Sequence, residues 1–388
     1  MRLRRIPVGL RILTHTPGRL AVSLAGVGLA IVLMFSQAGF RHGVLDSQAG
    51  LIQRLNGDLF ILGRQKSQMY VDELFPSRRL HQARICPGVH AVFPLYIEIQ
   101  RPVWRNPSDG SMRVIRVLAF DPDDPVFDMP DVQVHSAALK RPDTVLFDRQ
   151  ARDYFGRPQT GTVTELSQHK VNVVGTFRLG TDFLSDGNLI MSSRNFAKFF
   201  PIAPGHAASH LPGVAVGVVQ VAKDTDVHAV RQNLSRSLPA DVKVLTKQEL
   251  VNMEIRYWEE NTAIVLIFTL GTVVGFFIGI VICYQILYSN VSHYLPQFAT
   301  LKAMGFTSRY LVGIVMQQSI FLAGLAFLPA LAAAQGLFWI VGGLTGLLML
   351  LTPWRIAFIL VLAVAMCAVS GIIAVRRVMH TDPAEVFK

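Results

Sequence analysis

The sequence predicts a polytopic α-helical membrane protein with four transmembrane helices and a large α+β extracytoplasmic domain inserted between helices 1 and 2. The first observation behind this class is composition. Of the 388 residues, 51% are hydrophobic and only 16% are charged, whereas a soluble domain carries about 25% charged residues. The second is that long uncharged stretches flank residues 41–260, which hold 26 Lys and Arg against 24 Asp and Glu.

The uncharged stretches are long enough to cross a bilayer, since a spanning helix needs about 20 mostly apolar residues. Three of them fit one span each: 20–40, 262–288 and 356–375. Between Arg309 and Arg355 lie 45 uncharged residues. They could hold two spans, or one span at 311–334 and an apolar, Gly-rich segment within 335–355 at the outer interface.

The positions of the basic residues orient the spans, because short cytoplasmic loops collect Lys and Arg. Residues 1–19 carry five arginines and no acid, and Arg376 and Arg377 follow the last span. Both termini are therefore predicted inside, which requires an even number of spans. Four spans place 41–260 outside and leave 289–310 and the tail 376–388 in the cytoplasm.

A cleaved signal peptide is the alternative interpretation of the first span. Ser36-Gln37-Ala38 has the small-x-small pattern of a cleavage site. The apolar stretch is longer than the usual core of a signal peptide, and cleavage would leave three spans. That number conflicts with a C-terminus on the inside.

The external segment alternates short β-rich and helical patterns, which indicates an α+β domain. The strands that we expect are 58–62, 89–99, 113–120, 144–147, 170–177, 213–221 and 241–245. The helices that we expect are 72–83, 149–155, 193–199 and 226–238.

Two stalks are predicted where this domain joins the membrane. Thr246 and Glu249 form a Thr-x-x-Glu capping box, and no proline follows before residue 288. One helix over 247–288, including Tyr257 and Trp258, would extend about 63 Å, roughly twice the hydrocarbon core. The first span is similarly free of proline from Pro17 to Asn56. The alternative is a hinge near Arg41 or Glu260.

Motifs for catalysis and ligand binding are scarce. The sequence has no GxSxG, HExxH or GxxxxGK[ST] pattern, so we expect no enzymatic activity of these classes and no cofactor. His206 and His210 lie between Pro204 and Pro212, which favours a loop over a metal site. The acidic run at 121–128 lacks the central glycine and terminal glutamate of an EF-hand loop.

Three further classes of protein or scaffold are not favoured. The basic residues are not gathered with aromatic residues on one soluble face, so nucleic-acid binding is not predicted. The three cysteines are far apart in sequence and indicate no disulfide scaffold. Ion-coupled transporters usually carry ionisable groups within their spans, whereas these spans hold only glutamine, serine and threonine as polar residues of note. The energy source is therefore expected outside this chain.

The loop between the second and third spans is the strongest candidate for a functional contact. His293-Tyr294-Leu295-Pro296 ends the long helix, and 297–304 has the pattern of a short amphipathic helix. Its apolar stripe would comprise Phe298, Leu301 and Met304, with Lys302 on another face and Gly305 as the stop. The alternative is a helix that rests on lipid headgroups.

Several motifs resemble a known family. Leu301-Lys302-Ala303-Met304-Gly305-Phe306 is similar to the cytoplasmic loop of FtsX/MacB-like permeases of ABC transporters, and Asp382-Pro383-Ala384-Glu385 resembles their C-terminal tail. The DevC permease family resembles this chain more fully. The motifs shared with it are Asn56-Gly57-Asp58-Leu59, Ser77-Arg78-Arg79-Leu80, Pro94-Leu95-Tyr96, Trp104-Arg105-Asn106-Pro107, Val145-Leu146-Phe147-Asp148, Asp186-Gly187-Asn188-Leu189-Ile190, Tyr284-Gln285-Ile286-Leu287-Tyr288 and His293-Tyr294-Leu295-Pro296.

The resemblance implies a homodimeric permease subunit of a tripartite efflux system in the bacterial inner membrane. The implied partners are a DevA-type cytoplasmic ATPase, a DevB-type membrane fusion protein and a TolC-like outer-membrane channel. Mechanotransmission would drive efflux of a lipid or hydrophobic substrate, with the large domain in the periplasm. The residues implied in ATPase coupling are Pro296, Gln297, Phe298, Leu301, Lys302, Met304 and Gly305, and those of the stalk are Thr246, Glu249, Tyr257 and Trp258.

Two features limit what the resemblance implies. Gln297 and Gln318 occupy positions where many relatives have glutamate, so the role of those acids does not transfer directly. An FtsX-like regulatory membrane protein, which moves a periplasmic partner without transport, shares the same sequence features. It is the alternative function.

Overall fold

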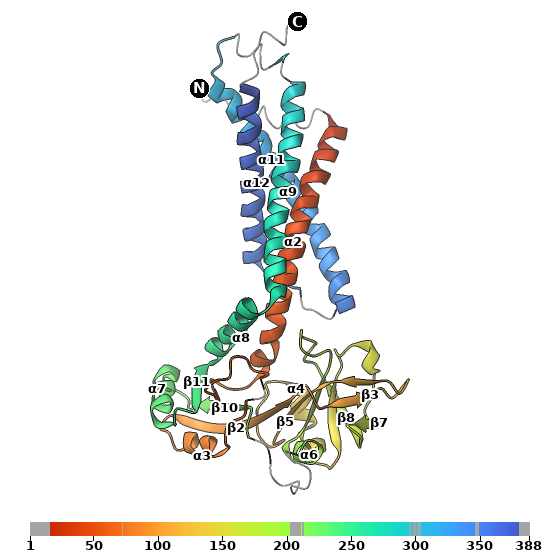
Figure 1. Ribbon diagram of the computed structural model, residues 1–388, viewed down its shortest axis with the longest axis vertical. Coiled ribbons are helices and arrows are strands. Elements are labelled where there is room, and N and C mark those ends of the chain that lie inside the picture. Colours follow the sequence, from red (N-terminus) through yellow and green to blue (C-terminus); the bar gives the residue numbers. More distant parts are fainter. Residues whose placement is uncertain are drawn as a thin grey trace. The chain divides into compact units, whose positions relative to one another are not determined.

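The computed structural model divides into two compact units (Figure 1). The helical unit comprises residues 1–43, 263–344 and 349–388, and the sheet unit comprises 44–262 and 345–348. The structure describes residues 16–71, 73–201, 211, 213–294, 296–297, 300, 304–345 and 349–379.

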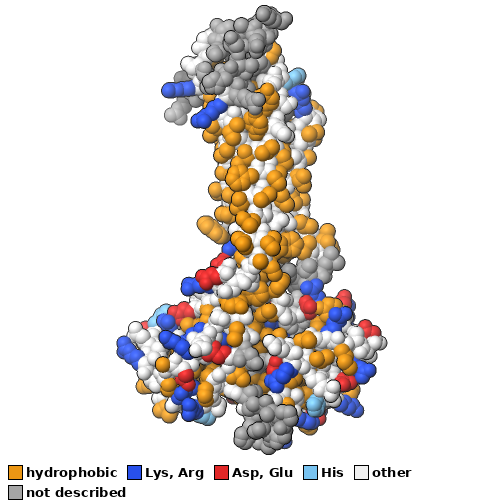
Figure 2. Space-filling model, in the orientation of Figure 1, with side chains coloured by type: hydrophobic (Ala, Val, Ile, Leu, Met, Phe, Trp, Pro, Cys, Tyr) orange, Lys and Arg blue, Asp and Glu red, His pale blue; other side chains and the backbone are white. Residues whose placement is uncertain are grey.

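Four long helices contribute to the helical unit: α2 (Pro17–Arg54), α9 (Ala263–His293), α11 (Ser308–Thr345) and α12 (Pro353–Met379). Among the described residues these are the helices long and apolar enough to cross a membrane, and the domain between the first and second is a mixed sheet. Hydrophobic side chains cover the visible faces of the four helices (Figure 2).

Glycines of α9 allow close packing against α2. A Cβ at Gly271 would lie 2.5 Å from Oε1 of Gln37, and one at Gly279 would lie 3.1 Å from Cβ of Ala30. Gly275 lies between them and faces Met34. The contacts run in opposite chain order, so the two helices are antiparallel. Small residues at four-residue spacing let helix backbones approach each other in a membrane.

Helix α12 contacts both α9 and α11 within the helical unit. The Ser370 hydroxyl donates to the carbonyl oxygen of Ile280 in α9 at 2.8 Å. A Cβ at Gly371 would lie 2.9 Å from Oγ of Ser319 in α11. The small residues of α12 therefore hold three helices close together.

Helix α11 is longer than the predicted span at 311–334. It continues through Thr345, so the first part of the expected interfacial segment at 335–355 is helical. The residues from 335 to 345 contain no charge and no proline, and glycine is well tolerated in membrane helices. Pro329 is accommodated inside the helix and does not end it.

The sheet unit contains an eleven-stranded sheet in the order β11-β1-β10-β2-β5-β9-β6-β8-β7-β3-β4. The pairs β5–β9 and β6–β8 are parallel, and the other ladders are antiparallel. The strands are β1 (Leu59–Gly63), β2 (Val89–Glu98), β3 (Val103–Arg105), β4 (Met112–Val114), β5 (Arg116–Phe120), β6 (Thr144–Asp148), β7 (Val163–Leu166), β8 (His169–Phe177), β9 (Asn188–Ser192), β10 (Val216–Val221) and β11 (Val242–Thr246).

Strand β2 connects the two halves of this sheet. Its residues from Val89 to Leu95 pair with β10, and its last residues, Tyr96–Glu98, pair with β5. The halves therefore share one continuous strand.

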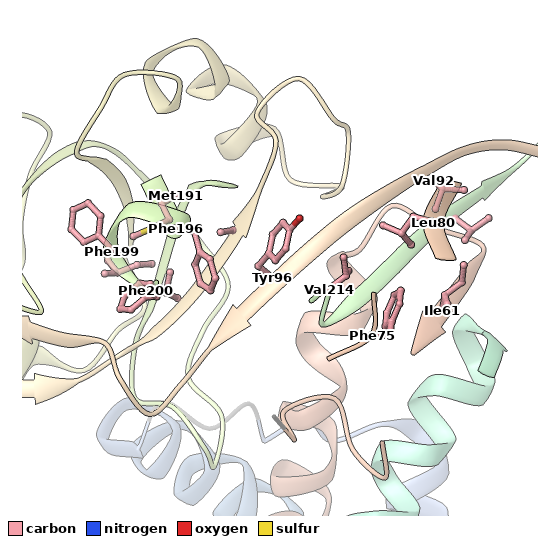
Figure 3. Packing of buried hydrophobic residues seen from close by; sticks show 14 of the residues in the cluster. Ile61, Phe75, Leu80, Val92, Tyr96, Met191, Phe196, Phe199, Phe200 and Val214 are labelled. Atoms are coloured by element: carbon pink, nitrogen blue, oxygen red, sulfur yellow. The ribbon is translucent and has the colours of Figure 1, made fainter. Parts of the chain in front are cut away.

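Apart from β4 and β7, which are mostly exposed or partly buried, the sheet is largely buried on both faces, and alternate residues of strands such as β1 and β5 contribute to two cores. In β1, Leu59 and Ile61 lie in one core while Phe60 and Leu62 lie in the other. Figure 3 shows the first core, where Leu80 and Phe196 belong to helices. That core is covered by α3 (Arg78–Arg84), α6 (Ser193–Phe199) and α7 (Val227–Ser237); the second includes residues of α4 (Pro130–Val134), α5 (Ser136–Leu139), the end of α2 and α8 (Lys247–Asn261).

All the predicted strands are present, and one of them is divided into two. The strand expected over 113–120 is split into β4 and β5 at Ile115, whose N–H donates to the Pro102 carbonyl oxygen instead of a ladder partner. Strands β3, β7 and β9 were not predicted. The helices expected at 193–199 and 226–238 are α6 and α7, and the side chain of Asp226 caps α7.

Two helix predictions are wrong. The segment 72–83 becomes helical only at Arg78, because Pro76 disfavours helical geometry in the residue before it and Phe75 pairs with Val214. The segment 149–155 forms turns and a short 3-10 helix (Asp153–Phe155). The Asp148 carboxylate there accepts the N–H of Gln150, a local bond that competes with helix formation.

The single helix expected over 247–288 is also wrong, because it is interrupted at Thr262. Helix α8 ends at Asn261, Thr262 is extended with φ −121° and ψ 129°, and α9 begins at Ala263. The Asn261 side-chain amide donates to the Tyr257 carbonyl oxygen at 3.0 Å, and the Thr262 hydroxyl donates to that of Trp258. These bonds satisfy last-turn carbonyls that a continuing helix would use. The first stalk is continuous, as expected, from Pro17 to Arg54.

Candidate functional site

The predicted coupling segment, residues 296–305, is described only in part. Phe298, Leu301 and Lys302 lie outside the described residues, so the apolar stripe stays a prediction. Pro296 and Gln297 are helical and exposed. The Thr300 hydroxyl donates to the Pro296 carbonyl oxygen at 3.0 Å, and the Met304 N–H donates to that of Thr300 at 3.0 Å.

The two ends of this segment are as the sequence predicts. Helix α9 ends at His293, just before Pro296. Gly305 has φ +91°, a left-handed conformation that glycine adopts without steric cost. The segment is therefore bounded by a proline and a glycine, and Met304 at its end is 63% exposed.

A second apolar feature directly after the segment was missed. The rings of Phe306 and Tyr310 are stacked with centroids 4.9 Å apart, and each residue is 42% exposed. Their spacing of four residues across the start of α11 was the available signal. With Met304 they form an exposed apolar cluster, which we call the 304–310 cluster.

The capping box predicted at the start of α8 is present. The Thr246 hydroxyl accepts the N–H of Glu249 at 3.2 Å, and the Glu249 carboxylate accepts the N–H of Thr246 at 2.9 Å. Glu249 also pairs with Arg231 of α7 at 3.1 Å. These contacts attach the first turn of α8 to β11 and α7.

The middle of α8 is anchored by Glu254, which was not predicted. Its carboxylate is fully buried, accepts the N–H of Met69 at 2.8 Å and accepts the Nε1–H of Trp258 at 3.1 Å. Burial raises the pKa of Glu254, while the bond from Met69 opposes that rise. The bond to Met69 joins residues 185 positions apart, so sequence spacing could not reveal it.

The two aromatic residues of the predicted stalk have different environments. Trp258 is 3% exposed, and its ring meets that of Phe183 edge to face at 5.5 Å. Tyr257 is half-buried and lines a shallow groove with Met253 and Leu245. Trp258 therefore fixes α8 to the sheet unit, and Tyr257 belongs to its surface.

The loop that carries Phe183 is held by a buried ionic network. Arg116 of β5, 1% exposed, donates to Asp182 at 2.5 Å and to the Asn188 side chain at 2.7 Å. Asn188 in turn donates to Asp148 at 2.7 Å. Burial is the largest single influence and acts to lower the pKa of Arg116, but Asp182, Tyr70 and Asp148 together outweigh it, so the pKa is raised. The guanidinium is thus charged, and α8 is connected through this loop to the sheet.

No catalytic or metal centre emerges from the described residues. They contain no group of three or more His, Cys, Asp or Glu side chains able to hold a metal ion, and His206 and His210 lie outside them. In the acidic run, Asp123 pairs with Lys140 at 2.5 Å. Burial together with Asp121 raises the pKa of Asp124 to about 6.

The two glutamines that the sequence analysis singled out lie in unlike surroundings. Gln297 is exposed in the coupling segment, whereas Gln318 of α11 is 2% exposed within the helical unit. The neutral amide avoids placing a charge in an apolar helix bundle, which is costly.

Comparison with known proteins finds a family model that matches the C-terminal third of the chain. Residues 263–383 match the family described as FtsX-like permease C-terminal. This stretch contains α9, the coupling segment, α11 and α12. No curated protein matches the chain.

Solved structures of two periplasmic or extracellular domains are similar to part of the chain. The periplasmic region of MacB from Actinobacillus actinomycetemcomitans is 9% identical, with a TM-score of 0.35, over 54% of this chain and 95% of that one. The extracellular domain of the noncanonic ABC-type transporter YknZ from Gram-positive bacteria is 11% identical, with a TM-score of 0.33, over 49% and 99%. TM-scores below 0.5 do not establish a shared fold.

Proposed function

We propose that this chain is the non-enzymatic permease subunit of an ABC-type transporter, with ATP hydrolysis in a separate cytoplasmic subunit. The observation that carries the proposal is the match of residues 263–383 to the FtsX-like permease C-terminal family. Four apolar helices in the described residues support it. The sequence has no phosphate-binding P-loop motif of its own, so the nucleotide must be bound elsewhere.

Within this class, the motif resemblance favours a DevC-like exporter of a lipid or hydrophobic substrate. The chain would form a homodimer in the bacterial inner membrane, with the sheet unit in the periplasm. A DevA-type ATPase, a DevB-type membrane fusion protein and a TolC-like channel would complete the system. Four spans with both termini in the cytoplasm follow from the basic residues at 1–19 and 376–377.

The coupling segment would dock the ATPase. An exposed apolar ridge suits a groove on a partner protein, and the 304–310 cluster extends that ridge beyond Met304. Proline and glycine at its ends separate the segment from α9 and α11, so it is set off as a short element of its own.

The path from this segment to the sheet unit would run through α2. Helix α9, which directly precedes the coupling segment in the chain, would cross the membrane. It packs against α2 along its glycines. Helix α2 then continues without interruption to Arg54, where it joins the core of the sheet unit. The route through α8 is interrupted at Thr262.

The docking proposal is tested by copurification of the cognate ATPase with full-length variants. Leu301→Asp or Met304→Asp would bury a charge in the contact, which costs several kcal/mol, and recruitment should be lost. Lys302→Ala is the matched control and should retain it. Equal recruitment by the Asp variants and the control would contradict docking through this ridge.

The alternative is an FtsX-like regulator that moves a periplasmic partner without transport. The match to an FtsX-like family is compatible with this function too. Reconstitution in vesicles with the ATPase and adaptor separates the two. ATP-dependent extraction of a labelled lipid supports export. ATP-dependent activation of a peptidoglycan hydrolase without lipid extraction supports regulation.

A further inference from the structure

The loop that joins β8 to β9, residues 178–187, holds two neighbouring apolar side chains in solvent. Phe183 is 48% exposed and Leu184 is 37% exposed. Among the described residues of the sheet unit, no other two consecutive large hydrophobic residues are both exposed to this degree. Single exposed apolar side chains are common, whereas contiguous exposed apolar surface indicates a contact site.

The backbone of this loop is fixed from inside the sheet unit. One oxygen of the Asp182 carboxylate accepts the N–H groups of Leu184 and Ser185, each at 2.9 Å. The other oxygen accepts from the guanidinium of Arg116 at 2.5 Å, and both members of this ion pair are buried. The Ser185 hydroxyl donates to the Gly187 carbonyl oxygen at 2.6 Å. The loop is therefore held in a shape that keeps its two apolar side chains outside the core.

The loop contacts the helix that leads to the second span. The Phe183 ring meets the Trp258 ring of α8 edge to face, with centroids 5.5 Å apart. Trp258 precedes Ala263, the first residue of α9, by five residues, which extend over at most about 18 Å. Helix α9 is long and apolar enough to cross a membrane. The exposed pair thus packs on a helix that ends just before a span begins.

Helices α9 and α12 run side by side in the same direction within the helical unit. A Cβ at Gly279 of α9 would overlap Met366 of α12. The next residue of α9, Ile280, accepts a hydrogen bond from Ser370 of α12. The two contacts follow the same chain order in both helices, so residues at equal distances from them lie at about the same level.

Aromatic residues mark the two membrane interfaces on these helices. Trp354 at the start of α12 is 80% exposed and Tyr288 near the end of α9 is 41% exposed, and Trp and Tyr are enriched at membrane interfaces. Trp354 lies twelve residues before the first contact, and the residue twelve before it in α9 is Ile267. From Ile267 to Tyr288 the helix rises about 32 Å, close to the thickness of the hydrocarbon core. Ala263 lies about 6 Å outside that core, at the level of the lipid headgroups.

We propose that Phe183 and Leu184 lie in the boundary between the headgroups and the acyl chains of the outer leaflet, and so form a membrane contact of the sheet unit. This inference rests on the proposed function only in that the chain spans a membrane with the sheet unit outside. Phe, Leu and Trp are the side chains with which interfacial segments enter this boundary. The contact supports the sheet unit beside α8, where Thr262 interrupts the helical connection.

The depth of the loop is measured on the full-length chain in lipid nanodiscs, without any ATPase. In a background whose native cysteines are replaced by alanine, a bimane probe is attached to Leu184→Cys, which keeps the Phe183 ring. The nanodiscs contain phosphatidylcholine with a nitroxide on the headgroup or on the upper acyl chain. The probe should be quenched as strongly as one on Trp354→Cys. A probe on Ile85→Cys should stay bright, because this exposed residue ends α3, on the face of the sheet opposite to α8.

A matched pair of substitutions tests whether the apolar character of the loop matters. Phe183→Asp and Phe183→Leu, each combined with the Leu184→Cys probe, both remove the ring that contacts Trp258. Only the aspartate would bring a charge to the lipid, which is costly. Quenching should fall to the level of the Ile85→Cys probe in the aspartate variant and persist in the leucine variant. Equal quenching in the two variants would overturn the proposal.

The remaining outcomes separate the membrane contact from the proposed function. Strong quenching at Trp354→Cys with none at Leu184→Cys would overturn the contact and leave the membrane spans in place. If the Leu184→Cys probe were then also shielded from aqueous iodide, a protein such as a second copy of this chain would cover the loop instead. Equal quenching at Leu184→Cys and Ile85→Cys would likewise overturn the contact. No quenching at Leu184→Cys or at Trp354→Cys would overturn both proposals.

Discussion

The helical and sheet units are joined by two connections of different construction. Helix α2 runs unbroken from Pro17 to Arg54, so one helix belongs to both units. The second connection consists of α8 and α9, with Thr262 extended between them. A continuous helix resists bending because every turn is hydrogen-bonded, whereas a single extended residue lacks that restraint.

The difference teaches that the two connections have separate tasks. Helix α8 is held to the sheet unit by Glu254 and Trp258, and α9 is held to α2 by its glycines. Thr262 thus separates two well-anchored helices. On the proposed function, motion would reach the sheet unit through α2, and Thr262 would accommodate the change.

The largest expected effect comes from breaking α2. A Gly-Pro insertion after Gly43 should abolish the ATP-driven change in distance between probes at Ile85 and Trp339, which are 84% and 80% exposed. The same insertion after Thr262 should leave that change largely intact. Energy transfer between probes in a background without native cysteines measures both, and equal loss in the two variants would contradict the comparison.

The substitution Trp258→Ala tests how α8 is anchored to the rest of the sheet unit. Removal of this buried ring should lower the free energy of unfolding of the sheet unit by about 3–5 kcal/mol. The control Tyr257→Ala removes a half-buried ring and should cost clearly less. Urea unfolding of the full chain in detergent measures the two; similar losses would show that α8 is not fixed through Trp258.

The substitution Gly279→Leu tests how α9 is packed within the helical unit. The new side chain would overlap Ala30 and Met366, and overpacking of this kind costs about 1–3 kcal/mol. Gly324→Leu in α11 is the control, because nothing lies within 4 Å of a Cβ there. Thermal unfolding in detergent should separate the variants, and equal melting temperatures would argue against tight packing of α9 on α2 and α12 at Gly279.

The smallest effect concerns the loop that receives the end of α2. The Arg54 carbonyl oxygen accepts the N–H of Asp128, and the Asn56 N–H donates to Val126. In the same loop the pKa of Asp124 is raised to about 6 from 3.8, mainly by burial. The folded protein therefore binds more protons than the unfolded chain between about pH 4 and 6, and stability falls as pH rises through that window.

Asp124→Asn removes this ionisation. Relative to the wild type, its melting temperature should be unchanged near about pH 4 and higher by about 2 °C or less near about pH 8, because the side chain is half exposed and solvent screens it. Melting curves at the two pH values measure the difference. A gain in melting temperature that is larger at the lower pH than at the higher pH would contradict the raised pKa of Asp124.

Local sequence patterns predicted those helices and strands that are determined by their own residues. Helices α6 and α7 follow from residues adjacent in sequence, and the capping box of α8 follows from four residues. The end of α8 did not, because the extended conformation of Thr262 interrupts an otherwise uniform helical pattern. Strand β3 is too short, at three residues, to show a period.

Contacts distant in sequence could not be predicted. The bond of Glu254 to Met69 depends on which elements become neighbours. The position of the coupling segment, by contrast, was evident from Pro296 and Gly305, since these residues act on the backbone directly. The surface that it would bind on the proposed function belongs to a second protein, which no pattern in this chain encodes.

The pairing of β1 with β11 has a consequence for how such a protein could arise. Leu59, where β1 begins, lies opposite Thr246, where β11 ends, and Cα atoms of such partners are about 5 Å apart. The polypeptide therefore enters and leaves the sheet at one spot. A folded module with adjacent ends can be inserted into, or removed from, a host chain without pulling the host apart. An ancestral bundle of helices could have acquired this sheet in one step, by a single insertion of DNA between its first two helices.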